Sequence, residues 1–83
     1  MLLLLGCGTI VVDDVTVMEN DYLRSRALIL DLAESELGCP RAALTTTVLS
    51  VTVHANIRTM QVSGCDKTAV YARSGDSFAR AAE

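Results

Sequence analysis

The sequence predicts an α+β fold in which one amphipathic helix packs on a three-stranded antiparallel β-meander. Apolar residues recur at helical spacing between Asp21 and Leu37, and three β-rich runs follow with turn-forming residues between them. A chain of 83 residues is long enough for one small domain. A sheet of three strands needs the helix across one face to be stable.

Size and composition make the core of this domain marginal. A chain of this length buries only about 60–65% of the surface that its unfolded form exposes. One Phe, two Tyr and no Trp leave aliphatic side chains to build nearly all of the core. Chains of this kind commonly need further stabilisation by a disulfide, a metal or a partner subunit. The net charge of −3 argues against a nucleic-acid partner, which would require a basic surface.

The first seven residues suggest an export signal. Met1–Leu5 is too short to span a bilayer, which needs about 20 apolar residues. Leu4-Leu5-Gly6-Cys7 resembles a bacterial lipobox, and the resemblance implies a thioether-linked lipid on Cys7. Residues 1–7 would then be the remnant of a lipoprotein-type signal. A basic segment before the leucines is missing, so an apolar strand with Cys7 as a buried thiol remains the alternative.

Residues 8–20 contain a β-prone run, Thr9–Met18, which Asp13 and Asp14 interrupt. The run is either a tether or an irregular strand added to the edge of the sheet.

The helix is predicted over Asp21–Leu37. Asn20 or Asp21 can serve as its N-cap, Gly38 can adopt the left-handed conformation that ends many helices, and Pro40 cannot continue one. On a helical wheel the apolar residues fall within one arc of about 160°. These residues are Tyr22, Leu23, Ala27, Ile29, Leu30, Ala33 and Leu37.

Three β-rich runs follow the helix: Leu44–Val53, Ala55–Ser63 and Thr68–Arg73. Leu49, Val51 and Val53 alternate and are expected on one face of the first strand. Turns are expected at His54–Asn56 and at Gly64–Lys67. The small domain thus covers residues 21–73, and residues 74–83 are predicted to be a flexible tail with one helical turn at Phe78–Ala82.

Two stretches carry a family resemblance: ELGCP at Glu36–Pro40 and VSGCDKTAVYAR at Val62–Arg73. A helix that ends in Cys-Pro, followed by V-x-G-C-x-[KR]-x-A-x-Y, resembles a family of short bacterial secreted or lipoprotein-type proteins that is frequent in myxobacteria. The likeness covers about residues 34–73. It implies an envelope protein and gives no activity. The family usually has Gly-Cys-Gly where this chain has Gly64-Cys65-Asp66.

If Cys7 carries a lipid, Cys39 and Cys65 remain as an even pair in an oxidising compartment, where a disulfide would persist. The bridge would tie the end of the helix to the last hairpin. Redox chemistry is disfavoured because Cys39 follows a helix C-terminus, whose partial negative charge opposes a thiolate. A zinc site built from Cys39, Cys65 and His54 lacks a fourth ligand.

These observations predict a non-enzymatic structural or interaction module, anchored by lipid on Cys7 to a bacterial cell-envelope membrane on the periplasmic or outer-membrane side. No catalytic residue, cofactor or metal site is expected. Ser50, His54 and Asp66 have the residue types of a catalytic triad, but nothing in the sequence places them together. A protein partner is expected at the sheet face or edges, with Arg58 and Arg73 as anchors. The alternative is a cytoplasmic regulatory or metal- and thiol-responsive protein with three free cysteines.

Overall fold

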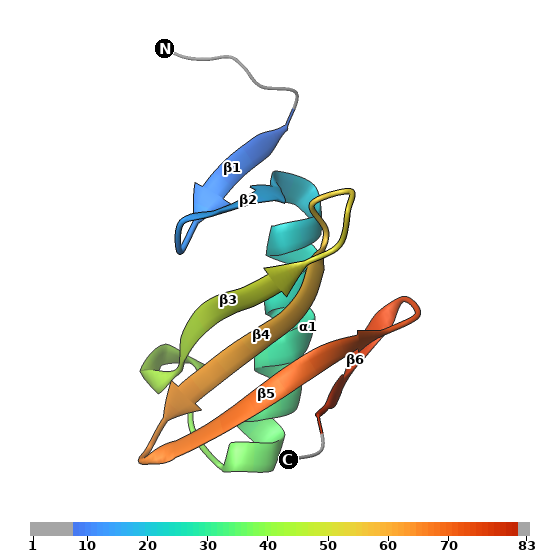
Figure 1. Ribbon diagram of the computed structural model, residues 1–83. Helices are drawn as coiled ribbons and strands as arrows, with labels where there is room; N and C mark the ends of the chain where they lie inside the picture. The colour runs from blue at the N-terminus through green and yellow to red at the C-terminus, as the bar shows by residue number, and fades with distance from the viewer. Residues whose placement is uncertain (1–7, 82–83) are drawn as a thin grey trace.

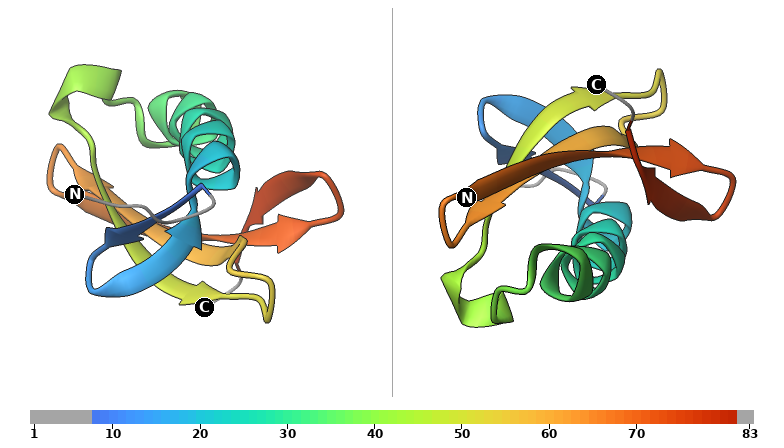
Figure 2. Two further views of the ribbon diagram at one scale, coloured as in Figure 1. Left: turned by 90° about the horizontal axis from the view of Figure 1, so that it is seen from above. Right: turned by 90° about the horizontal axis from the view of Figure 1, so that it is seen from below.

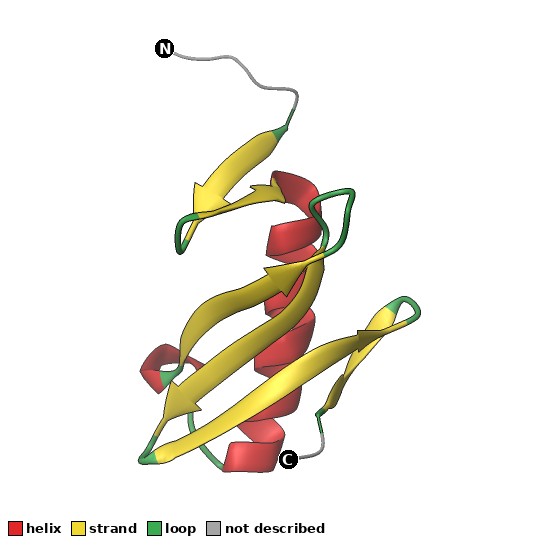
Figure 3. Ribbon diagram, in the orientation of Figure 1, coloured by secondary structure: helices red, strands yellow, loops and turns green. Residues whose placement is uncertain are grey.

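The computed structural model describes residues 8–81 of the chain. Within these residues the fold is α+β, with one α-helix, one short 3-10 helix and six strands in two antiparallel sheets (Figures 1 and 3). The elements in chain order are β1 (Thr9–Val12), β2 (Val15–Met18), α1 (Glu19–Leu37), η1 (Arg41–Ala43), β3 (Thr45–Val51), β4 (Ile57–Gly64), β5 (Lys67–Ser74) and β6 (Ser77–Arg80).

The main sheet is a meander of four strands in the order β3-β4-β5-β6, so the predicted count of three was wrong. The fourth strand lies where a helical turn at Phe78–Ala82 was predicted. A tight turn with Gly75 at φ 64° joins β5 to β6. Phe78 is then only 6% exposed, and burial of its aromatic ring favours the strand over an exposed helical turn. Ala82 and Glu83 lie outside the described residues.

Residues 9–18 form a separate two-stranded hairpin, so they are neither a tether nor a strand added to the edge of the main sheet. β1 and β2 pair along their full length, from Thr9 opposite Met18 to Val12 opposite Val15. Asp13 and Asp14 make the two-residue turn with φ of 53° and 65°. A tight hairpin turn needs positive φ at both positions, and aspartate tolerates it better than most residues. The same two residues that interrupt the β run therefore reverse the chain.

The helix ends as predicted and begins earlier than predicted. Gly38 adopts a left-handed conformation with φ 62°, and its N–H donates to the carbonyl of Glu34. At the other end the N-cap is Met18, without a side-chain hydrogen bond, so the prediction of Asn20 or Asp21 was wrong. The N–H of Glu19 instead donates to the carbonyl of Gly8 at 2.7 Å, which leaves the Asp21 side chain for other contacts.

The buried face of α1 is narrower than the predicted arc and slightly rotated. Ile29, Leu30, Ala33 and Leu37 are buried as expected, whereas Leu23 is 55% exposed and Ala27 is also exposed. Ser25, which the wheel placed outside the arc, is 2% exposed. A serine can take that position because its hydroxyl is hydrogen-bonded there.

A bulge in β3 changes which of its residues face the helix. The register shifts around Leu49, so Val48 lies opposite Met60 while Ser50 lies opposite Thr59. An extra residue reverses the alternation beyond it, which turns both Val48 and Val51 toward the core. Leu49 is 47% exposed and Val53, beyond the strand, is 95% exposed. The predicted common face of Leu49, Val51 and Val53 was therefore wrong.

The molecule has two layers, with α1 across one face of the four-stranded sheet (Figure 2). The β1–β2 hairpin lies at the end of the molecule where α1 begins (Figure 1). One continuous core fills the space between these parts. Its buried members are Val17, Ile29, Leu30, Ala33, Leu37, Cys39, Leu44, Val48, Ile57, Met60, Val62, Ala69, Tyr71 and Phe78.

Candidate functional site

The structure brings the predicted cysteine pair together at one end of the molecule. Cys39 follows the left-handed Gly38 and is buried, and Cys65 lies in the two-residue turn between β4 and β5. A disulfide joins them, with the Cα atoms 5.9 Å apart, inside the usual range for such bridges. Lys67 Nζ adds a hydrogen bond to the carbonyl of Leu37 at 3.0 Å, so the turn is held to the helix end twice.

Gly64 permits the hairpin to lie close to the segment between α1 and β3. A Cβ atom at this position would lie 2.6 Å from the carbonyl oxygen of Ala43 and 2.8 Å from Leu44 Cδ2. Real Cβ atoms do not come that close to backbone oxygen, so a larger residue would push the strand away. Close packing alone thus explains why a glycine stands at position 64, and no bound ligand is needed to explain it.

Cys7, the predicted lipid attachment site, lies outside the described residues. Within residues 8–81, neither helix combines the length and the apolar composition that a bilayer span requires. The lipid anchor stays a prediction.

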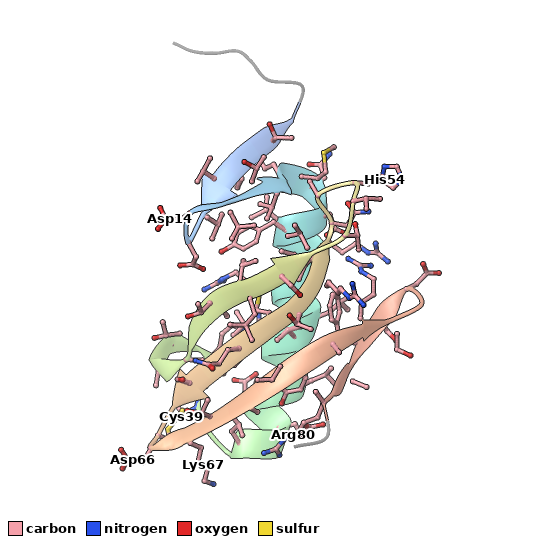
Figure 4. The ribbon with its side chains drawn as sticks, viewed as in Figure 1. Asp14, Cys39, His54, Asp66, Lys67 and Arg80 are labelled. Atoms are coloured by element: carbon pink, nitrogen blue, oxygen red, sulfur yellow. A yellow bond between two sulfur atoms is a disulfide. The ribbon has the colours of Figure 1, made fainter. Side chains whose placement is uncertain are left out.

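The residues considered for metal binding or a catalytic triad do not converge. His54 is exposed at the β3–β4 turn, while Cys39 and Asp66 lie at the opposite end of the molecule (Figure 4). Ser50 shares a hydrogen bond with Thr59 at 2.6 Å. In the described part of the chain, His, Cys, Asp and Glu side chains form no group of three or more that could hold a metal ion.

A largely buried ion pair between Asp21 and Arg73 joins the start of α1 to the end of β5. Arg73 Nη2 lies 2.8 Å and 3.0 Å from the two carboxylate oxygens of Asp21, and the two side chains are 20% and 14% exposed. The N–H of Ile57 donates to Asp21 at 2.7 Å, and Arg73 Nε donates to the carbonyl of Ile57 at 2.8 Å. Ser25 and the Phe78 ring complete the surroundings of the guanidinium.

This network corrects the role that the sequence suggested for Arg73. A guanidinium with three hydrogen-bond partners and an aromatic ring 4.9 Å from its carbon is committed to the fold. It is therefore not an exposed anchor for a partner. Arg58 on β4 is exposed, and its role as an anchor stays a prediction.

A second polar contact between the layers joins Tyr71 on β5 to Glu36 near the end of α1. The phenol of Tyr71 donates to Glu36 Oε1 at 2.9 Å. Burial of the ring, followed by the hydrogen bond to Glu36 and its negative charge, raises the pKa of Tyr71 to about 12. The phenol therefore remains a neutral donor throughout the physiological pH range.

A groove lies between α1 and β6. It has a volume of about 390 Å³, within the range of small ligand sites. Its apolar lining comes from Leu28 and Leu32 on the helix and Phe78 on β6. The polar lining residues are Asp31, Ser35, Glu36 and Ser77, so the charged members of the lining are both acidic. No sequence pattern indicates this groove, because the groove depends on β6, a strand that was not predicted.

Comparison of the chain with protein-family models, with curated proteins and with solved structures found no match.

Proposed function

We propose that this protein is a non-enzymatic structural or interaction module of the bacterial cell envelope, held at a membrane through a lipid on Cys7. The protein would act through surface contacts of a small domain that a disulfide cross-links. The observation that carries the proposal is the Cys39–Cys65 disulfide.

The disulfide supports an oxidising compartment. Bridges of this kind persist in secreted and periplasmic proteins and are rare where thiols are kept reduced. The two cysteines are separated by 26 positions, and closing such a loop stabilises the fold by about 3.5 kcal/mol in the chain-entropy model. That is a large share of the stability of a domain this small. Export from the cytosol is therefore the simplest setting in which the chain keeps its fold.

The polar groups inside the domain support a role in binding rather than catalysis. Asp21, Arg73 and Ser25 bond to one another, and Tyr71 bonds to Glu36. The side chains of Asp21, Arg73, Ser25 and Tyr71 are committed to contacts that hold the helix on the sheet, whereas Glu36 keeps part of its carboxylate exposed. Such mutual pairing is typical of a structural network.

The test is expression in a bacterial host from the genomic reading frame, followed by fractionation and intact-mass measurement. We expect the protein in the membrane fraction, with a lipid mass on Cys7. The Cys7→Ala variant should leave that fraction or remain unprocessed, while the Cys39–Cys65 bond still forms. Recovery of the unmodified chain from cytosol with three free thiols would favour the alternative of a cytoplasmic thiol-responsive protein.

A further inference from the structure

We propose that the groove between α1 and β6 binds an extended, basic peptide segment of a partner protein, which pairs with β6 as a fifth strand of the main sheet. This inference deepens the proposed function, and it rests on that function only in assuming that the domain acts by binding. It is carried by the open edge of β6, the apolar lining of the groove and the sign of its charges.

The register of the sheet fixes which backbone groups of β6 are open. Ser74 lies opposite Ser77 across a two-residue turn, and the N–H of Ala81 donates to the carbonyl of Val70 at 2.8 Å. In an antiparallel pair the bonded positions alternate, so Ser77, Ala79 and Ala81 bond to β5. Phe78 and Arg80 then direct their N–H and C=O groups away from β5. No other backbone group among residues 8–81 bonds to them.

These open groups lie beside the groove. Both views in Figure 2 show β6 on the helix side of β5, so its outer edge runs along α1. Phe78 lines the groove from the strand, and Leu28 and Leu32 line it from the helix. A peptide that hydrogen-bonds to β6 would place every second side chain against these residues.

The other edge of the sheet is already occupied at its centre. Asp13, from the turn of the β1–β2 hairpin, accepts a hydrogen bond from the N–H of Val48 on β3 at 2.8 Å. A carboxylate at this place obstructs pairing with a further strand. Of the two edges of the meander, β6 is thus the one whose backbone groups are available to pair with a further strand.

Charge complementarity selects a basic segment. Asp31 and Glu36 are the charged residues of the groove lining, and the protein has a net charge of −3. Arg41 pairs with Asp31 at the surface and Glu36 accepts from Tyr71, but both carboxylates stay exposed. The preferred peptide therefore has an aliphatic residue facing Leu28 and Leu32 and a Lys or Arg two positions away, facing the carboxylates.

The test uses the full-length oxidised chain with Cys7→Ser, so that binding is measured independently of the lipid. The probe is a capped peptide, Thr-Thr-Leu-Thr-Lys-Thr-Thr, titrated into ¹⁵N-labelled protein. We expect the amide signals of Phe78 and Arg80 to shift and their hydrogen exchange to slow, because these N–H groups gain a partner. Signals of Leu28 and Leu32 should shift with them. Replacing the peptide's Lys by Glu should weaken binding at least about threefold.

Arg80 offers a matched pair of variants. Arg80→Pro removes the outward N–H of β6 and leaves its ladder with β5 intact, since proline is tolerated at such edge positions. It should weaken binding roughly five- to tenfold, the effect of one hydrogen bond. Arg80→Ala keeps the N–H and removes the same guanidinium, whose charge acts on Tyr71 beside Glu36, so it should bind the basic peptide at least as tightly as the parent. If Arg80→Pro fails to fold, Ser35→Lys should abolish binding by placing a cation in the groove, with Ser74→Lys on β5 as its control.

Three results would overturn the proposal: no shifts in the groove at millimolar peptide, shifts without slower exchange at Phe78 and Arg80, or equal losses in both Arg80 variants. Dimerisation of the protein through β6 would assign the edge to a second copy instead. Each of these outcomes is independent of whether Cys7 carries a lipid, so failure of the groove and failure of the envelope proposal are separate results.

Discussion

At the scale of single residues, two side chains of α1 determine how the helix lies on the sheet. Asp21 receives a backbone N–H from β4 and the guanidinium of Arg73 from β5, and Glu36 receives the phenol of Tyr71. The two contacts lie about four turns apart along the helix. They fix its rotation and its position over the strands, which apolar side chains alone would define less sharply.

The neutral form of Tyr71 is stabilised in the folded protein, and this predicts a loss of stability at alkaline pH. Because the pKa is raised from 10.0 to about 12, the contribution is complete below pH 10 and is lost as the pH rises toward 12. A phenol absorbance titration of Tyr22→Phe protein should show an ionisation near pH 12. Glu36→Gln removes the anion and should move that ionisation closer to 10. An unchanged midpoint in Glu36→Gln would contradict the contact.

Residue patterns predicted some of these roles and missed others. Gly38 and Pro40 mark the helix end from the chain alone, since each has a conformational reason to stop a helix. The sequence alone is compatible with Asp21 as an N-cap, which is not the role it has in the structure. Its contact with Arg73 joins residues 52 positions apart, and no local pattern indicates it. Cys39 and Cys65 could be paired because only two cysteines remain once Cys7 is assigned to lipid.

At the scale of elements, the apolar periodicity of residues 21–37 predicted the helix well, while the strands were predicted less well. The bulge at Leu49 reverses the alternation of side chains between the two faces of β3. The prediction of its buried face depended on that alternation alone. β6 has four residues, of which Phe78 alone is buried. So short a strand gains its stability from β5 and α1, and its own sequence carries almost no β signal.

The helix face can be tested with neighbouring positions. Leu30 is 1% exposed, so Leu30→Asp buries an unpaired carboxylate and should cost several kcal/mol, enough to unfold a marginal domain. Asp31 is exposed and pairs with Arg41 at the surface, so Asp31→Asn should change the free energy of unfolding by less than about 0.5 kcal/mol. Urea denaturation followed by circular dichroism measures both. Equal effects would mean that the helix packs by another face.

At the scale of the whole molecule, the contacts along the sheet are local and those between the layers are long-range. β3, β4, β5 and β6 follow one another in a meander, so each strand pairs with its neighbour in the chain. The helix α1 precedes all four strands in the chain, so the contacts that hold it on the sheet join residues far apart in the sequence. The Asp21–Arg73 pair does this where α1 begins, and the Cys39–Cys65 bridge does it just past its end.

The disulfide should therefore be the largest single contribution to stability. The oxidised protein should be about two daltons lighter than the reduced protein, since each bridge forms with loss of two hydrogens. Reduction should lower the free energy of unfolding by about 2–5 kcal/mol, as in other small domains that lose a native bridge.

In a Cys7→Ser background, Cys39→Ser/Cys65→Ser should show the same loss without any reductant. The measurement is urea denaturation of the two proteins side by side. If the double variant unfolds at the same urea concentration as the oxidised parent, the bridge is not what holds the helix end to the hairpin, and the compartment inferred from it loses its main support.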